Sequence, residues 1–178
     1  MAVLPIIVAP DPRLKQLCAP VEAVDDALRR LMDDMLETMY QAPGIGLAAP
    51  QVGVLKRIIV ADVAREGESP QPHCLANPEI TWVSDHDATY EEGCLSLPEH
   101  YADVVRPAEV KIAYLDREGQ RRELAASGLL ATCLQHEIDH LDGILFVDHI
   151  SALKRNMILR KLLKAKKSGK LAEPAAAE

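Results

Sequence analysis

Residues 135–141 (Gln-His-Glu-Ile-Asp-His-Leu) combine two histidines and a glutamate at a spacing that suits a metal site on a helix. Because an α-helix turns about 100° per residue, His136 and His140 lie on one face, one turn apart, and can bind one ion. Glu137 lies about 60° round the helix from His140. It is too far round to complete the pair as a ligand, but close enough to reach a water on the metal. The segment therefore predicts a metal site with a carboxylate beside it.

The surroundings of this segment predict a buried helix with an apolar back face. Four side chains fall roughly 120–200° from the first histidine on the helical wheel: Leu130, Leu134, Ile138 and Leu141. Leu129 and Cys133 fall back on the metal side, where they can line an apolar pocket. Ser127 is a good N-cap and Gly143 a good stop for this helix. The bare motif also fits a satisfied pair of structural histidines, so it is suggestive only.

A catalytic metal needs a third protein ligand and an open position, so the rest of the chain must supply that ligand. Cysteines stand at positions 18, 74, 94 and 133, and none forms Cys-x-x-Cys. Cys94 follows Gly93 at the end of a predicted strand, where a backbone bend exposes side chains and N–H groups. Cys133 lies one turn before His136, but helical projection makes it a pocket wall at least as easily as a ligand. A lone cysteine is usually a small buried hydrophobe, so the third ligand stays open at this point.

The composition is that of a globular protein with an uneven charge distribution. The 178 residues are 48% hydrophobic and 26% charged, which predicts one domain with a sizeable core. The net charge is −7, yet residues 154–170 hold eight Lys or Arg and no acid. An acidic body with a basic end indicates a polyanionic partner for that end. No apolar run approaches membrane-spanning length and no secretory signal is visible, so we expect a cytoplasmic protein with free thiols.

The order of the predicted elements indicates an α+β fold. A helix capped by Asp25 runs to about Tyr40, with a Met and Leu stripe that belongs to the core. Residues 44–51, with two glycines, suit a loop that lies against a ligand or another backbone. Strands are predicted at 6–8, 54–63, 74–83, 86–91, 102–106, 109–116 and 120–125, and a last, basic helix at about 151–167. We therefore expect antiparallel or mixed β-sheets packed around a central metal-binding helix, with an N-terminal helix and a C-terminal helix.

Three segments resemble, in order and at similar spacing, the three motifs of the peptide deformylase family. They are residues 44–51 (Gly-Ile-Gly-Leu-Ala-Ala-Pro-Gln), 92–96 (Glu-Gly-Cys-Leu-Ser) and 135–141. The resemblance runs from about residue 3 to 165 and implies that 1–178 form a single catalytic domain. It implies a metal-dependent hydrolase that removes the formyl group, as formate, from the N-terminal formylmethionine of nascent bacterial polypeptides.

The resemblance also implies roles residue by residue. The metal would be bound by Cys94, His136 and His140. Glu137 would be the general base and acid, while Gln51 and the backbone N–H of Leu95 would hold the oxyanion. The substrate would contact Gly44, Ile45, Gly46, Gly93, Tyr101, Leu129, Thr132 and Cys133. Tyr101 stands where many bacterial members carry an Arg that helps to hold the peptide.

Cofactors and partners follow from the same resemblance. The metal would be Fe²⁺, which Zn²⁺, Ni²⁺ or Co²⁺ can replace. The basic helix at 151–170 resembles that of the bacterial subgroup that docks on the ribosome, and a flexible tail at 171–178 would follow it. We expect a monomer that acts in the bacterial cytoplasm without contact to a membrane.

Two other functions fit parts of the sequence. A His-Glu-x-x-His zinc endopeptidase would need a third ligand downstream of the motif, and the nearest candidates are Asp142, Asp148 and His149. None of them sits in the Gly-containing ligand pattern that such proteases use. A non-catalytic ribosome- or RNA-binding protein with a structural metal would suit the basic end. Its site would normally be closed by a fourth protein ligand, and Glu137 and Gln51 would then have no role.

Overall fold

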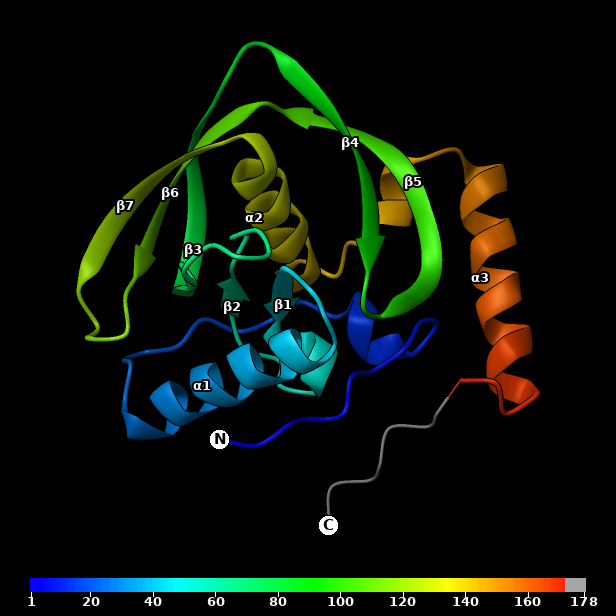
Figure 1. Ribbon diagram of the computed structural model, residues 1–178, viewed down its shortest axis with the longest axis horizontal. Coiled ribbons are helices and arrows are strands. Elements are labelled where there is room, and N and C mark those ends of the chain that lie inside the picture. The colour runs from blue at the N-terminus through cyan, green and yellow to red at the C-terminus, as the bar shows by residue number, and fades with distance from the viewer. Residues whose placement is uncertain (172–178) are drawn as a thin grey trace.

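A central helix lies between two antiparallel β-sheets, as Figure 1 shows. The computed structural model describes residues 1–171. The helices are α1 (Asp26–Gln41), α2 (Gly128–Leu141) and α3 (Ala152–Lys167), with the short 3-10 helices η1 (Pro12–Lys15), η2 (Ala49–Val52) and η3 (Phe146–His149). The strands are β1 (Gly46–Ala48), β2 (Ile58–Ala61), β3 (His73–Val83), β4 (Asp87–Cys94), β5 (Leu97–Pro107), β6 (Glu109–Leu115) and β7 (Arg121–Ser127). Residues 172–178, most of the expected terminal tail, lie outside the described part.

The two sheets differ in size and position. The larger one has the strand order β1-β2-β3-β6-β7, and the smaller one pairs β4 with β5. Every pairing in both sheets is antiparallel. Helix α2 contacts strands of both sheets, α1 packs on β1 and β2, and α3 lies along the outside of β5 (Figure 1). The predicted α+β fold around a central helix is therefore confirmed.

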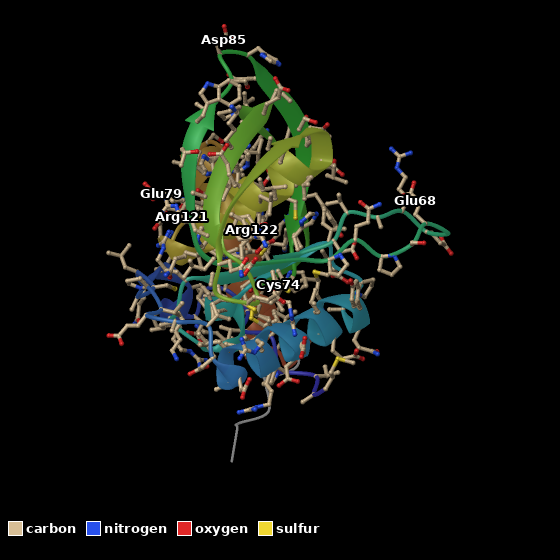
Figure 2. The ribbon with its side chains drawn as sticks, turned by 90° about the vertical axis from the view of Figure 1, so that its left-hand side faces the viewer. Glu68, Cys74, Glu79, Asp85, Arg121 and Arg122 are labelled. Atoms are coloured by element: carbon tan, nitrogen blue, oxygen red, sulfur yellow. The ribbon has the colours of Figure 1, made fainter. Side chains whose placement is uncertain are left out.

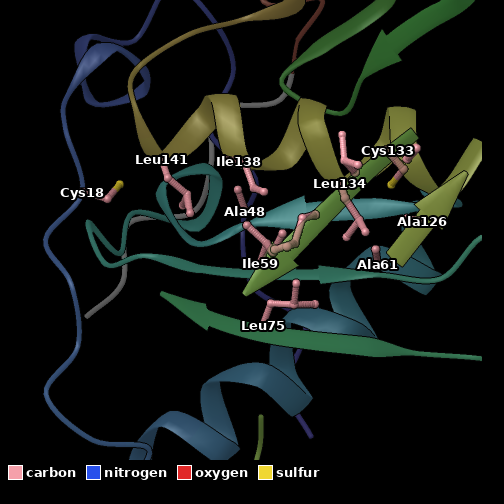
Figure 3. Close-up of a cluster of buried hydrophobic side chains, with 13 residues drawn as sticks. Cys18, Ala48, Ile59, Ala61, Leu75, Ala126, Cys133, Leu134, Ile138 and Leu141 are labelled. Carbon is pink, nitrogen blue, oxygen red and sulfur yellow. The ribbon is translucent and has the colours of Figure 1, made fainter. Parts of the chain in front are cut away.

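Successive side chains of β2 point to opposite faces of the larger sheet, so the sheet packs against a helix on each face. Ile59 belongs to the apolar cluster under α2, whereas its neighbour Ile58 belongs to the cluster formed with α1. Figure 3 shows Leu134 and Ile138 of α2 directed at the sheet, close to Ile59. Leu141 completes this row, so the predicted apolar back face of the metal helix is confirmed.

Helix α1 follows the sequence prediction closely. The Asp25 carboxylate accepts a hydrogen bond from the Leu28 N–H at 2.9 Å and begins the helix. Met32, Met35 and Met39 are fully buried, which confirms that the methionine stripe is core. The stripe packs on the face of the larger sheet opposite α2.

Four local predictions differ from the structure. Residues 6–8 form no strand. The segment is joined to η2 by a single backbone hydrogen bond, from the Ile7 N–H to the Gln51 carbonyl at 2.8 Å, and one bond does not make a ladder. The strand expected at 54–63 shortens to β2, because a tight turn at Val54 precedes it. The glycine-rich segment expected as a loop instead forms β1 and η2, since β1 pairs with β2. Ser127 stands at the N-cap of α2, but its side chain makes no cap hydrogen bond.

Three turns connect the strands at the periphery. Figure 2 shows Glu68 on the projecting loop between β2 and β3, and Asp85 at the tip of the turn between β3 and β4, far from α1. The predicted hairpin turn between β6 and β7 is closed by the Gly119 N–H, which donates to the Asp116 carbonyl at 3.0 Å. Within residues 1–171, no helix has the length and apolar character needed to cross a membrane.

Candidate metal centre

The end of β4 and one face of α2 bring three candidate ligands together. The Cys94 sulfur and a ring nitrogen from each of His136 and His140 lie within 4.8 Å of one another. The Cys94 Sγ atom is 3.3 Å from His140 Nε2. The β4–β5 register shifts between Gly93 and Cys94, and such an irregularity re-aims a side chain beside a site. The third candidate ligand that local sequence left open is therefore Cys94.

The other side chains considered as third ligands are engaged elsewhere. Cys133 donates from its Sγ atom to the Ile45 carbonyl at 3.4 Å. His149 Nε2 lies 2.7 Å from the Asp139 carboxylate, outside the cluster. Asp142 and Asp148 pair with Arg57 and Lys15, respectively. Across residues 1–171 the cluster holds no fourth such side chain, which leaves a tetrahedral ion one open position.

The chemistry of the donor set fits a divalent ion. One thiol and two imidazoles are ligands that suit Zn²⁺ and related transition metals. Burial lowers the pKa of His140 well below its ordinary value, so this ring is neutral, as a ligand must be. His136 directs Nδ1 at a carboxylate, at 2.8 Å, which leaves its Nε2 atom for the ion.

The carboxylate on His136 belongs to Glu92, to which the sequence assigned no role. Glu92 is buried and also receives two hydrogen bonds from the buried Arg106, at 2.7 and 2.9 Å. Burial alone would raise the pKa of Glu92, but the hydrogen bonds from His136 and Arg106 outweigh it and lower that pKa to about 2. A carboxylate on the far ring nitrogen fixes the tautomer and orientation of a ligating histidine. The signal available in sequence was that Glu92 lies two residues before Cys94 on one strand.

Glu137 is a buried carboxylate placed beside the ligands without joining them. Its side chain is on α2 next to His136, and the residue is 4% exposed. Burial raises the pKa of Glu137 to about 7, with the nearby Glu92 charge adding to the effect. Its Oε2 atom is buried and has no hydrogen-bond partner within residues 1–171. Such an atom needs a polar partner in the cavity it faces.

Gln51 lines the cavity from η2, which directly follows β1. Its Oε1 atom accepts the Ala48 N–H at 2.9 Å, which fixes the orientation of the amide. Its Nε2 atom then points at the Cys94 sulfur, 3.5 Å away, and at Ser96 Oγ, 3.1 Å away. Leu95 follows Cys94 and lines the same cavity. The amide donor of Gln51 therefore lies beside the Cys94 sulfur at the edge of the candidate metal centre.

A cavity of about 250 Å³ opens beside the cluster. It is lined by every residue predicted to contact substrate: Gly44, Ile45, Gly46, Gly93, Tyr101, Leu129, Thr132 and Cys133. Ile45, Leu129 and Tyr101 are 42%, 42% and 64% exposed, so these apolar and aromatic groups form the mouth. The sequence reasoning missed Tyr90 and Glu91, which line the cavity from β4 and carried no motif.

Comparison with known proteins gives a consistent result. The family model described as polypeptide deformylase matches residues 3–156. The peptide deformylase of Phenylobacterium zucineum is 60% identical over 168 residues, covering 94% of this chain and 99% of that protein. The peptide deformylase of Rhizobium meliloti is 56% identical, covering 94% and 97%. A crystal structure of peptide deformylase from Ehrlichia chaffeensis superposes with a TM-score of 0.90 at 41% identity, covering 96% of this chain and all of that one.

Proposed function

Since the chain belongs to the peptide deformylase family, it is a hydrolase that removes the N-formyl group from nascent polypeptides, and we propose that it does so at Cys94, His136 and His140. The observation that carries this assignment is the geometry of Glu137. A buried carboxylate with one oxygen lacking a partner among the described residues lies beside three converging ligands and faces the cavity.

The chain's own residues divide the work of the reaction. A divalent ion, when bound to the three ligands, supplies Lewis acidity that activates water and the formyl carbonyl. Glu137 accepts the proton of the attacking water and passes it to the departing amine. Gln51 Nε2 and the Leu95 N–H donate to the carbonyl oxygen as it becomes negative, and one such donor typically contributes about 3–4 kcal/mol. Glu137 and Gln51 are buried, so electrostatic interactions at these groups are screened less than in bulk water.

Formate release tests this proposal directly. Protein purified without oxygen is given an N-formylmethionyl peptide, and formate is measured with time. We expect turnover that a chelator abolishes and that added divalent metal restores. Cleavage inside an unformylated peptide, or no formate from the metal-loaded protein, would contradict it. The first of these outcomes would support the zinc endopeptidase alternative.

We further propose that the ion in the cell is Fe²⁺, acting in a cytoplasmic monomer whose catalytic domain is the whole chain. A thiolate ligand donates more charge to the ion than a third imidazole would, which tempers its Lewis acidity and makes metal identity matter. Metal analysis of protein purified with and without oxygen tests the proposal. The expected result is iron in the protein purified without oxygen, and zinc in its place, with a loss of turnover, in the protein purified in air.

The apolar mouth predicts a preference for methionine. Leu129 lies at the start of α2 and lines the cavity together with Ile45 and Cys133. Leu129→Phe adds volume at the wall of a pocket that suits an unbranched side chain, which costs about 1–3 kcal/mol where the ligand fills it. We expect KM to rise about tenfold for a formyl-Met peptide and much less for a formyl-Ala peptide. Steady-state kinetics on both peptides test this expectation. Equal changes in KM for the two peptides would show that Leu129 does not contact the methionine side chain of the substrate.

Helix α3 supports a ribosomal partner. Its apolar side packs on the body through the buried Leu162, with Ile158 and Leu159 half-buried beside it. Most of its basic side chains face solvent: Lys154, Arg160, Lys161, Lys164, Lys166 and Lys167. We propose that this basic face binds ribosomal RNA. A solvated helix that only aids solubility is the alternative.

A variant with three lysines neutralised distinguishes RNA binding from a role in solubility better than truncation does. Truncation would also remove the buried Leu162. We expect the triple variant Lys161→Gln, Lys164→Gln, Lys167→Gln to lose most ribosome co-sedimentation while it hydrolyses a short formyl peptide normally. Binding of the unchanged chain should fall steeply with salt, since each phosphate contact contributes about 0.7–0.9 to the log–log slope. The control neutralises Lys56, Lys111 and Arg121 on the body. Equal co-sedimentation of both variants would contradict a role for α3.

A further inference from the structure

One buried arginine joins the two parts of the fold that carry the candidate metal ligands. Arg106 lies on β5 and is 5% exposed. Its Nε and Nη2 atoms donate to both oxygens of Glu92, at 2.7 and 2.9 Å. Its third donor, Nη1, reaches the Asp139 carboxylate at 2.8 Å. A single guanidinium therefore holds one carboxylate from β4 and one from α2.

Both carboxylates are tied to ligands of the proposed centre. Glu92 Oε1 lies 2.8 Å from His136 Nδ1, on the same strand as Cys94. Asp139 directly precedes His140 on α2 and also contacts His149 of η3, at 2.7 Å. The Arg106 side chain thus contacts His136 indirectly, through Glu92. It also connects β4 with α2, and these two elements must keep their relative position for the three candidate ligands to meet.

The chemistry of the position calls for arginine in particular. The guanidinium is planar and presents donors in a fixed fork, so it can hold one carboxylate with two hydrogen bonds and a second with another. A lysine keeps the charge, but its single ammonium cannot reproduce this fork. A buried ion pair that only stabilised the fold could lie anywhere in the core. Arg106 instead lies between Glu92, which contacts His136, and Asp139, which precedes His140. This location indicates a role in the metal centre.

We propose that Arg106 is a positioning residue for the metal centre, which sets metal affinity by fixing the Glu92 carboxylate on His136 and by holding α2 against β4. This inference rests on the proposed function, because it assumes that Cys94, His136 and His140 bind the ion. Arg106 is neither a candidate ligand nor part of the cavity lining. It acts through the orientation of a ligand ring and the spacing of two ligand-bearing elements.

The experiment is a Co²⁺ titration of the metal-free full chain, followed by visible absorption, which is sensitive to ligand geometry. The variants are Arg106→Lys, which keeps the buried charge, and Arg106→Met, which removes it. The matched control is Arg57→Lys. Arg57 also pairs with an acid at the end of α2, Asp142, at 2.8 Å, and donates to the Leu141 carbonyl at 3.3 Å, but it contacts no carboxylate that is hydrogen-bonded to a candidate ligand.

We expect Arg106→Lys to weaken Co²⁺ binding about 10–100-fold, as is usual when an outer partner of a ligand is lost, and to shift the absorption bands. Arg57→Lys should leave both unchanged. If Arg106→Met does not fold, Arg106→Lys decides the question alone. Affinity and bands within twofold of the unchanged chain, or equal losses in the Arg57 control, would overturn the role of Arg106. An unchanged chain that bound no Co²⁺ would instead overturn the metal centre itself.

Discussion

Replacing Glu137 with glutamine is expected to lower kcat by about 10²–10⁴-fold, which corresponds to about 3–5 kcal/mol of barrier. The amide keeps the size of the carboxylate and can still hydrogen-bond, but it cannot accept a proton. All three candidate ligands remain, so metal content should not change. KM should change little, because the carboxylate acts mainly in the transition state.

Kinetics and metal analysis on the same Glu137→Gln preparation check this expectation. Glu79→Gln, an exposed change on β3, is a control for handling and should behave like the unchanged chain. A metal-loaded Glu137→Gln protein with nearly unchanged kcat would mean that another group moves the proton. Loss of the metal would mean that Glu137 is itself a ligand.

Gly46→Ala is expected to lower kcat/KM by roughly 10²-fold, because displacing a catalytic group by about 1 Å can have this effect. A Cβ atom at Gly46 would lie 2.8 Å from the Cys133 sulfur and 2.9 Å from Glu137 Cδ, and closer still to Glu137 Oε1. Cys133 is 4% exposed and held by its hydrogen bond to Ile45, so it cannot yield easily. The carboxylate of Glu137 must then move away from its working position.

Activity and thermal unfolding of Gly46→Ala are measured together. Gly67→Ala is the control, since no atom lies within 4 Å of a Cβ placed there. The Gly67 backbone has a φ of 88°, so the control has a backbone cost of its own and should lose stability but not activity. A Gly46→Ala protein with full activity would show that the site tolerates a shift of Glu137.

Local periodicity was enough to predict the elements that carry the chemistry. The back face of α2 and the methionine stripe of α1 are read from side chains three and four apart, and both meet apolar partners in the structure. The pairing of His136 with His140 is likewise set within one helix. These helical faces are set by residues three and four apart in the chain, so they can be predicted from the sequence alone.

Features that depend on distant pairing could not be predicted in this way. Strand β1 has three residues and exists because Leu47 lies opposite Val60, which local composition does not record. The contact of Glu92 with His136 joins positions 44 apart, and the Arg106 bridge depends on the register of β4 with β5. The choice among four cysteines for the third ligand required the same information, which the family resemblance supplied instead.

The division of the three candidate ligands between the smaller sheet and the helix on the larger sheet would have a thermodynamic consequence. Cys94 belongs to the two-stranded sheet, whereas both histidines belong to the helix that is packed on the five-stranded sheet. An ion bound by all three cross-links the halves of the molecule and favours the folded state by mass action. At a free metal concentration about 1,000 times the dissociation constant, this linkage contributes about 4 kcal/mol to the free energy of unfolding. Conditions that deplete the metal would therefore lower the free energy of unfolding as well as the turnover.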